Sequence, residues 1–560
     1  MKGIARSSRW AKPALAVVGV AALLGVSVLL ATAQTEKEKE APVPTAAIPG
    51  KASPADLEAG KAIYFRKCVW CHGPEGAGDG PGADRLWPRP RNFNQGTFKI
   101  RHTASGELPL ISDLFDTVTH GLPGSAMPSW SGILTDKQRR QVVEFVRTEL
   151  VKDRDFSDQE NETYTPISFG KQVSTSKESI ERGREVYMNK GKCVECHGPD
   201  ARGDGNATQK DEWDFPIRPA DLHKCWNFRG NRGDPYNPRN IFREVSTGLN
   251  GTPMPSFADA LSEQQRWDVA NFVISLCPKK KIDLLTMKPN NDFVVKSKLV
   301  KGEIPANPDD PKWQEIDPSY VGLGSQIMHK PRNFVRLVDD MWVRSLYTKD
   351  QVAYFLEWDD RNKSLGTPQA LAKVANFQET PPSGDPIAMR EYPVFNDAVA
   401  IQFATHWETL SPPEKPRFVF GDAKNPVDLW KWEADGTMKL YVGQGFDKLE
   451  PRAGDAVKAS FVGFKDGVWR VILIRALETS DKEQDVQFTT GKYIPTSFFV
   501  WDGNNGDHGL KNSISTWYYT ILMPPVPTKA YVYPLFAAAF VIGLQYWVTS
   551  KFKKGPKKKK

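Results

Sequence analysis

KCVWCHGPEGAGDG (67–80) and KCVECHGPDARGDG (192–205) are two versions of one short stretch, and they decide how the first half of this 560-residue chain is interpreted. Each version contains two cysteines and a histidine in the order Cys-x-x-Cys-His. The similarity extends to the preceding residues, which read SPADLEAGKAIYFR before the first stretch and SKESIERGREVYMNK before the second. The chain therefore contains an internal duplication.

The order Cys-x-x-Cys-His is typical of covalent attachment of a c-type haem. Two thiols bond the two vinyl groups of one porphyrin, and the next residue presents its imidazole to the iron. A zinc site would need four protein ligands, and no second Cys or His pair lies nearby in the sequence. A redox dithiol is the other alternative. The predicted haem-attachment residues are Cys68, Cys71, His72, Cys193, Cys196 and His197.

Each iron also needs a ligand on its second face. Met127 in GSAMPSW and Met254 in GTPMPSF follow their histidines at nearly the same offset and precede similar helices. Thioether ligation raises the potential of a haem. We expect these two methionines to be the axial ligands, with His102, His120 and His223 as the alternatives.

The terminal segments of both repeats have helical patterns. Ser53 followed by Pro54 predicts a helix start. LTDKQRRQVVEFV and LSEQQRWDVANFV open with capping boxes and repeat apolar residues at helical spacing. The two repeats, 54–150 and 176–278, resemble the class I cytochrome c domains of bacterial respiratory chains. That resemblance implies a three-helix core around each haem, with one haem edge open for electron transfer.

The pattern changes after a Pro- and Lys-rich linker, CPKKKIDLLTMKPNND. Short alternating runs such as DAVAIQFATHW and TMKLYVGQG are separated by Asp-Gly and Asn-Gly turn signals. Runs of this kind predict an antiparallel β-sandwich over 293–526. The acidic turns EWDDRNK and WDGNNGD do not follow the EF-hand pattern, and we interpret them as hairpin turns.

Four stretches of this half resemble the haem-b domain of ethylbenzene dehydrogenase γ-subunits: LYTKDQVAYFLEWDD, NDAVAIQF, GDAKNPVDLWKW and VWDGNNGDHGLKNSISTW. Relatives in that family are γ-subunits of dimethylsulfide dehydrogenase, chlorate and selenate reductases and nitrite oxidoreductase. Related sandwich domains also bind sugars. The family's lysine and methionine hold one non-covalent haem b, which implies that Lys511 is a ligand here. Gln402 stands near the expected methionine, so Met389 and Met328 are the candidates, followed by His406, while His508 could replace the lysine.

Both chain ends carry targeting signals. Residues 1–33 have basic residues, an apolar run and a small-residue cleavage site, which predicts a signal peptide, with an uncleaved anchor as the alternative. YVYPLFAAAFVIGLQYWV (531–548) is long enough to span a bilayer, although a buried C-terminal helix is the alternative. The basic tail, 549–560, predicts a cytoplasmic end and a periplasmic body. Basic residues contribute +4 at the N-terminal end and +7 at the C-terminal end of a chain whose net charge is +8, so the body between them is near −3 and gives no indication of nucleic-acid binding.

Cys225 and Cys277 remain, both in the second repeat. In an exported protein such a pair predicts a disulfide, and two free buried thiols are the alternative.

No residue pattern suits bond-breaking chemistry, so we expect an electron-transfer subunit rather than an enzyme. The resemblance implies a relay between molybdenum- and iron–sulfur-containing subunits and a soluble cytochrome c or terminal oxidase, through one haem b and two haems c. Two alternatives are a free-standing membrane cytochrome and a sugar- or peptide-binding module linked to cytochromes.

Overall fold

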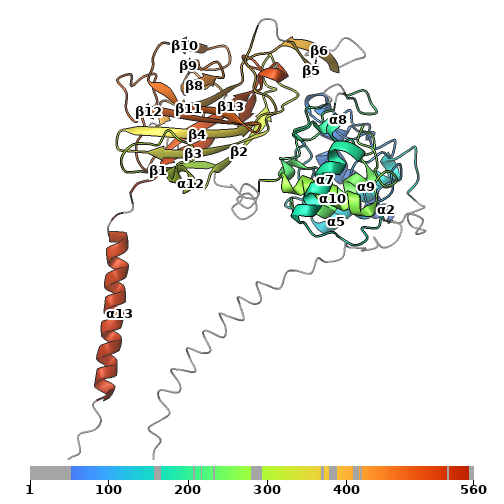
Figure 1. Ribbon diagram of the computed structural model, residues 1–560, viewed down its shortest axis with the longest axis horizontal. Coiled ribbons are helices and arrows are strands. Elements are labelled where there is room, and N and C mark those ends of the chain that lie inside the picture. The colour runs from blue at the N-terminus through green and yellow to red at the C-terminus, as the bar shows by residue number, and fades with distance from the viewer. Residues whose placement is uncertain are drawn as a thin grey trace, which may run out of the picture. The chain divides into compact units, whose positions relative to one another are not determined.

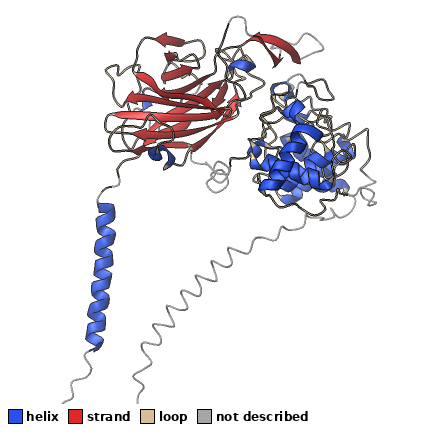
Figure 2. Cartoon of the chain, viewed as in Figure 1, coloured by secondary structure: helices blue, strands red, loops and turns tan. Residues whose placement is uncertain are grey.

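The computed structural model describes residues 52–156, 166–205, 209–215, 217–230, 234–278, 293–367, 371–377, 387–407, 415–416, 419–525, 527 and 529–553. Helices predominate in the chain up to residue 278, and strands predominate from residue 293 to residue 522 (Figures 1 and 2). The predicted signal peptide and most of the predicted linker lie outside the described residues. The predicted order of helical repeats followed by a β-rich region is confirmed.

The first repeat begins with a helix that carries the first cysteine motif at its C-terminal end. Its helical segments are α2 (Pro54–Lys67), α3 (Val69–His72), η1 (Ala83–Arg85), α4 (Ile111–His120), α5 (Asp136–Phe145) and η2 (Val146–Leu150). The second repeat follows the same order with α7 (Lys177–Glu185), η3 (Val186–Lys190), α8 (Val194–His197), η4 (Cys225–Asn227), α9 (Pro238–Thr247) and α10 (Glu263–Ser275).

The helix starts follow the predicted capping chemistry. The Ser53 hydroxyl accepts a hydrogen bond from the Asp56 backbone N–H at 3.1 Å, and proline follows Ser53. Thr135 and Ser262 form complete capping boxes at the starts of α5 and α10. These reciprocal bonds satisfy two of the backbone N–H groups that a helix start leaves without partners.

The first and last helices of each repeat cross at a glycine. A Cβ atom at Gly60 would lie 2.1 Å from the backbone oxygen of Gln141, and one at Gly183 would lie 2.0 Å from that of Asp268. Only a residue without a side chain permits so close a crossing. Tyr64 and Tyr187 follow four residues later, and each donates a 2.6 Å hydrogen bond to the glycine carbonyl after the motif histidine. The Gly and Tyr shared by the two repeats therefore position the motifs.

The β region contains a short helix, α12 (Pro311–Gln314), and a 3-10 helix, η6 (Gly503–Asn505). Its strands are β1 (Val294–Leu299), β2 (Ser319–Ser325), β3 (Asp340–Tyr347), β4 (Gln351–Asp359), β5 (Leu371–Phe377), β6 (Ile387–Pro393), β7 (Ala398–Ala404), β8 (Val427–Glu433), β9 (Met438–Gly443), β10 (Leu449–Arg452), β11 (Val457–Lys465), β12 (Val468–Ala476), β13 (Tyr493–Trp501), β14 (Ser513–Ser515) and β15 (Tyr518–Leu522).

Hydrogen bonds join all but β5 and β6 into one sheet of 13 strands, in the order β10-β9-β8-β7-β13-β14-β2-β3-β4-β12-β11, with β1 and β15 attached to it. The neighbours along this path are antiparallel, as predicted, whereas β1 pairs in parallel with β15 and β3. β5 and β6 form a separate hairpin. The division of the large sheet into two packed layers stays a prediction.

One apolar core spans the large sheet. Leu440 of β9 and Val457 of β11 stand near opposite ends of the strand order, yet they belong to one cluster of buried side chains. The sheet is therefore strongly curled, so that its two ends share a core. Four fully buried tryptophans contribute to this core: Trp358, Trp430, Trp432 and Trp469.

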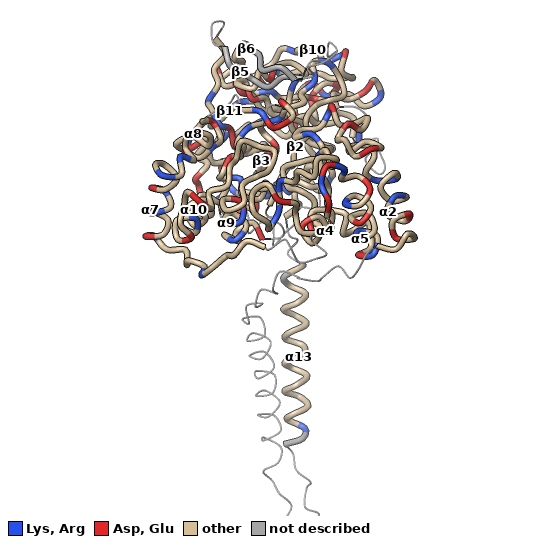
Figure 3. Tube along the Cα trace, turned by 90° about the vertical axis from the view of Figure 1, so that its right-hand side faces the viewer, with Lys and Arg blue, Asp and Glu red and all other residues tan. Residues whose placement is uncertain are grey.

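The final helix, α13 (Lys529–Lys553), contains a stretch from Val532 to Lys551 that is long and apolar enough to cross a membrane. None of that stretch is buried against the rest of the described chain. In Figure 3 no residue of this helix has the colour of Asp and Glu, and its basic residues lie only near its two ends, among them Lys529 and Lys551. An exposed apolar helix does not fit the alternative of a buried C-terminal core helix, and it agrees with the predicted anchor by length and composition.

Candidate functional site

The first cysteine motif forms a single helical turn directly after α2. Cys68 lies between α2 and α3, and its backbone N–H donates to the Tyr64 carbonyl at 2.8 Å. Cys71 and His72 then lie on α3. Burial raises the pKa of the Cys68 thiol to about 12, with a smaller contribution from Cys71. A redox dithiol needs a lowered thiol pKa, so this environment favours thioether attachment over redox chemistry.

The motif histidine is oriented by a backbone carbonyl. The Nδ1 of His72 lies 3.1 Å from the Arg91 carbonyl oxygen, and the imidazole stacks on the Phe93 ring at 4.4 Å. Nδ1 therefore carries the proton, which leaves the Nε2 lone pair available for iron. Burial lowers the pKa of His72 to about 4, so the ring is neutral near pH 7.

The second motif has the same geometry. The Nδ1 of His197 lies 3.1 Å from the Ala220 carbonyl oxygen, and burial again lowers the pKa of the imidazole. Burial raises the pKa of Cys193 to about 11. Both predicted histidine ligands are therefore neutral, with the same tautomer and a backbone partner that fixes the ring.

The repeated HGP and GDG letters have a structural reason. Gly73 and Gly198 end the motif helices with φ near +77° and +78°, a conformation that favours glycine. A Cβ atom at either position would lie 2.0 Å from a carboxylate oxygen, that of Asp79 in the first repeat and of Asp204 in the second. The loop thus closes tightly over the motif helix in both repeats.

The methionine loops also repeat. The Met127 carbonyl accepts from the Leu122 N–H at 3.0 Å, and the Met254 carbonyl accepts from Leu249 at 3.1 Å. Each loop begins at a glycine with positive φ, Gly121 or Gly248. Met254 lines the same cavity as His197, so the structure brings these two predicted residues together.

The cavity at the second motif has a volume of about 620 Å³, within the range of small-molecule and cofactor sites. Its lining includes Cys193, Cys196, His197 and Met254 of the second repeat, Trp87, Lys99 and Gly124 of the first repeat, and Arg336, Asp359 and Arg361 of the β region. The two predicted thioether cysteines and the predicted iron ligands therefore share one cavity to which all three parts of the chain contribute.

Two basic groups, Lys99 and Arg218, line this cavity, and the carboxylates that act on them lie outside its lining: Asp211 and Glu212 for Lys99, and Asp502 and Asp507 for Arg218. Burial and the neighbouring Arg229 and Arg91 hold the pKa of Lys99 well below its ordinary value. Burial lowers the pKa of Arg218 to about 10, and its Nε has no hydrogen-bond partner among the described residues. Carboxylates of a bound group would compensate these charges. The residues present therefore fit a haem with its two propionates.

The alternative histidines are engaged elsewhere. The Nδ1 of His102 lies 2.5 Å from Asp113, and that of His223 lies 3.2 Å from Asp221. His120 is exposed at the end of α4. Cys225 and Cys277 form the predicted disulfide, which links η4 to the end of α10.

Lys511 is buried rather than exposed in its polar loop. Its Nζ donates to the Asn505 carbonyl at 2.6 Å and lies 3.5 Å from an Asp507 carboxylate oxygen. Coordination of iron would require Nζ to leave these oxygens, so the fit to a haem b is incomplete in this arrangement. Burial raises the pKa of Asp507 to about 7.

The candidates for the opposite ligand are dispersed. Met328 is 57% exposed and follows Gln326, whose side chain donates to the Leu510 carbonyl next to Lys511. Met389 lies on β6, where side chains are outside the description. Gln402 is buried and donates to Ser497, so it does not take the place of the expected methionine.

His406 and His508 complete the candidates. His406 pairs with Glu483. His508 stacks on Phe395, and its Nδ1 lies 2.9 Å from the Gly506 carbonyl oxygen. The structure therefore brings the second motif and Met254 to one cavity, whereas Met127 as the ligand opposite His72 and the ligand opposite Lys511 stay predictions.

The residues that connect the second repeat to the β region are not evident from the sequence. Arg361 donates to the carbonyl oxygens of Gly203 and Pro219, which flank the second motif. Lys224 lies 2.9 Å from an Asp339 carboxylate oxygen. Arg361 stands in EWDDRNK, which we interpreted as a plain hairpin turn. The clustering of charges in that turn was the only available signal.

Comparison with known proteins defines the class. The family of cytochrome c oxidase, cbb3-type, subunit III matches residues 55–146 and again 178–273, and the ethylbenzene dehydrogenase family matches residues 310–462. The fold and the duplicated motifs define a multidomain haem protein of electron transport. More specifically, the chain joins two cytochrome c domains of the cbb3 subunit III type to an ethylbenzene dehydrogenase-type domain.

Three curated relatives are similar to this chain. A protein of Haloferax mediterranei named as a respiratory nitrate reductase heme subunit is 24% identical, over 42% of this chain and 75% of its own length. The dimethylsulfide dehydrogenase subunit gamma of Rhodovulum sulfidophilum is 27% identical, over 39% and 76%. The chlorate reductase subunit gamma of Ideonella dechloratans is 28% identical, over 23% and 52%, so the chain spans about half the length of that relative.

A solved structure, the Kuenenia stuttgartiensis reducing HAO-like protein complex, is 38% identical over 39% of this chain and 96% of the matched chain, with a TM-score of 0.36.

Proposed function

We propose that this chain is the membrane-anchored multihaem subunit of an oxidoreductase complex of the molybdenum type, and that it relays electrons between that complex and a soluble cytochrome c or terminal oxidase. The observation that carries the proposal is the cavity at His197, because residues of both cytochrome c domains and of the ethylbenzene dehydrogenase-type domain line it. A haem bound there would contact all three parts of the chain.

We assign the ligands as follows. Cys68 and Cys71 attach one haem c and Cys193 and Cys196 another, with His72 and His197 as the first iron ligands and Met127 and Met254 as the second. The haem supplies one-electron chemistry when bound. A backbone carbonyl orients each imidazole, and Lys99 and Arg218 would pair with the propionates of the second haem.

A third, non-covalent haem b belongs to the β region, with Lys511 as one ligand. Lys511 is already buried, and its partner Asp507 would accept a proton readily because burial raises the pKa of Asp507 to about 7. Met328 lies in the segment bonded to Leu510, which favours it over Met389 as the second ligand.

The three domains would then act in the order haem b, second haem c, first haem c. The support is positional, since Arg361 of the β region contacts Gly203 and Pro219 beside the second motif. We place the domains at 54–150, 176–278 and 293–526, with α13 as the anchor and the body on the periplasmic side.

Haem analysis of the purified full chain tests the cofactor content. We expect about two haems c that resist extraction with acidified acetone and about one haem b that the solvent removes. Mild purification from native membranes should also recover molybdenum and iron–sulfur clusters in the same complex. A chain with haem c alone, recovered without those metals, would contradict the proposal and favour a free-standing cytochrome.

A further inference from the structure

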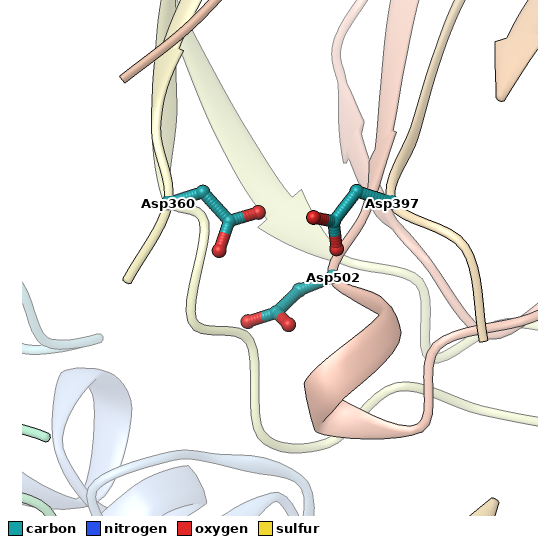
Figure 4. A group of neighbouring side chains, drawn as sticks. All are labelled: Asp360, Asp397 and Asp502. Atoms are coloured by element: carbon teal, nitrogen blue, oxygen red, sulfur yellow. The ribbon is translucent and has the colours of Figure 1, made fainter. Parts of the chain in front are cut away.

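Three aspartates from separate segments of the β region meet beneath its surface. Asp360 follows β4, Asp397 precedes β7 and Asp502 follows β13. One carboxylate oxygen of each lies within 4.8 Å of the others, and in Figure 4 the carboxyl groups of Asp360 and Asp397 face each other with that of Asp502 below them. All three residues are at least 97% buried, with exposures of 3%, 0% and 3%.

The backbone brings these residues together. Ala398 pairs with Trp501 across β7 and β13, so Asp397 and Asp502 are neighbours at one end of that strand pair. The Asp397 N–H donates to the Ser364 carbonyl at 3.1 Å, which ties the segment after β4 to the same place. The cluster therefore joins two distant parts of the curled sheet.

Buried carboxylates at such distances repel one another. Burial raises the pKa of Asp360 well above its ordinary value, and the charges of Asp502 and Asp397 raise it further. Burial and Asp502 raise the pKa of Asp397 to about 7. Isolated buried charges are costly unless they are paired, hydrogen-bonded or bound to a metal.

Nearby basic groups compensate the cluster unevenly. Arg218, Arg361 and Lys511 act on Asp502, and Lys224 acts weakly on Asp360. For Asp360, however, repulsion from the other two carboxylates is the strongest effect of any side chain. Among the described residues, three basic side chains therefore act on Asp502, whereas Asp360 and Asp397 have no comparable basic partner.

One oxygen of the cluster has no partner among the described residues. Asp360 Oδ1 accepts from the Asn362 N–H, whereas Asp360 Oδ2 is buried and unpaired. By contrast, the oxygens of Asp397 accept from the N–H groups of Ser364, Gly503 and Trp469. A cation bound among the three carboxylates would give this oxygen a partner and offset their repulsion.

We propose that Asp360, Asp397 and Asp502 bind one calcium ion. The donors are oxygens, without nitrogen or sulfur, which disfavours zinc and copper. Calcium binds oxygens at 2.3–2.6 Å, so ligand oxygens on opposite sides of one ion lie about 5 Å apart, and the span of 4.8 Å is compatible with that. Magnesium requires shorter bonds and near-ideal octahedral geometry.

The ion connects two sites described above. Arg361 follows Asp360 and holds the carbonyls beside the second cysteine motif. Asp502 starts the loop that ends at Lys511, since η6 follows it and the Asn505 carbonyl accepts from Lys511. Any effect of the ion on haem b rests on the proposed function, but calcium binding itself does not.

Equilibrium dialysis of the full-length holoprotein against radioactive Ca²⁺, after EGTA treatment, tests the site. Asp360→Asn is the variant, because it keeps the side-chain size and removes one charge. Asp350→Asn is the matched control at the other end of β4, where the side chain is 71% exposed. We expect the variant to bind about one Ca²⁺ fewer than the wild type and the control to bind the same number.

Thermal unfolding gives a second measurement. At about 100 times the dissociation constant, Ca²⁺ should raise the wild-type Tm by roughly 5–10 °C relative to EGTA. Asp360→Asn should lose that response, yet equal or exceed the wild type in EGTA because one repulsive charge is gone. If the variant does not fold, the wild-type response to Ca²⁺ against Mg²⁺ still decides. Absence of bound Ca²⁺, an equal response to Mg²⁺, or unchanged Ca²⁺ binding by Asp360→Asn would overturn the proposal.

Discussion

The two cytochrome c repeats share the geometry of their Cys-x-x-Cys-His motifs but differ in what surrounds those motifs. His72 and His197 lie at the same 3.1 Å from a backbone carbonyl oxygen. At the equivalent position inside the motif, the first repeat has Trp70, which is 65% exposed, and the second has Glu195. Only the second repeat has the disulfide and the Lys224 contact with the β region. The two motifs thus offer the same chemistry to a haem, whereas their surroundings differ, and this difference bears on the proposed order of the relay.

The order of the relay predicts the largest difference between the repeats. Cys193→Ala with Cys196→Ala removes the second haem, and we expect electron transfer between haem b and the first haem to stop. The matched variant, Cys68→Ala with Cys71→Ala, should leave transfer from haem b to the second haem intact. Stopped-flow reduction, followed at the separate haem absorption bands, measures both. Undiminished transfer through a chain without the second haem would show that the order is wrong.

Met127 and Met254 should contribute equally to the reduction potentials of their own haems. Met127→His and Met254→His replace the proposed thioether ligand by imidazole, and each should lower the potential of its own haem by on the order of 100 mV or more. Potentiometric titration of the purified chain checks this. If a substitution leaves both potentials unchanged, the methionine it replaces is not an iron ligand. We do not expect this outcome for one methionine alone, because the two loops have the same backbone hydrogen bond to the methionine carbonyl.

The disulfide should stabilise the second repeat alone. Cys225 and Cys277 are separated by 52 residues, and closing such a loop stabilises a fold by about 4 kcal/mol in the chain-entropy account. Cys225→Ala with Cys277→Ala should therefore lower the free energy of unfolding of the second repeat and leave the first repeat unchanged. Denaturant titration that follows the Soret band of each haem separates the two, and equal losses in both repeats would argue against a local effect.

The ion pairs of the two repeats should also contribute differently to stability, although by less than the disulfide does. Lys224 and Asp339 are 8% and 22% exposed, and the carboxylates of Asp339 and Asp340 raise the pKa of Lys224 despite its burial. Lys224→Met removes the cation that pairs with Asp339 and Asp340 and leaves them only the neutral donors Asn227 and Trp226, so it should cost about 3 kcal/mol of unfolding free energy.

Lys152→Met is the matched control in the first repeat. Its pair with Glu75 is 49% and 75% exposed, so the change should be within about 1 kcal/mol. Equal effects of the two substitutions would mean that the contact between the second repeat and the β region is not held by this pair.

The sequence predicted those features whose chemistry depends on residues close together in the chain. Cys68 to His72 form one helical turn, and the Met127 loop was recognised because the alignment of the two repeats places it opposite the Met254 loop. Ser262 with Gln265 is a local capping pattern and was found for the same reason. The cluster of Asp360, Asp397 and Asp502 is not evident in the sequence, because its members follow or precede three different strands and meet only through the pairing of β7 with β13 and the bond from the Asp397 N–H to the Ser364 carbonyl.

The proposed haem b site depends on contacts that the sequence does not predict. The family resemblance indicated Lys511, but burial against Asn505 and Asp507 depends on the fold of the whole loop. The ligand on the other face depends on which methionine the curled sheet brings near that loop, and spacing along the chain does not encode this.

The helix caps should give the smallest effect, and one that is the same in both repeats. Thr135→Ala and Ser262→Ala each remove a side-chain acceptor for an N–H at the start of α5 or α10. Loss of such a cap costs about 1 kcal/mol. Chemical denaturation with the Soret band of each haem as the probe should show a similar decrease in each repeat. Because the two capping boxes are equivalent, the two substitutions should lower the free energy of unfolding equally. A markedly larger loss for Ser262→Ala would mean that α10 depends on its cap even though the disulfide lies at its other end, and the disulfide would then not be the main stabilising difference between the repeats.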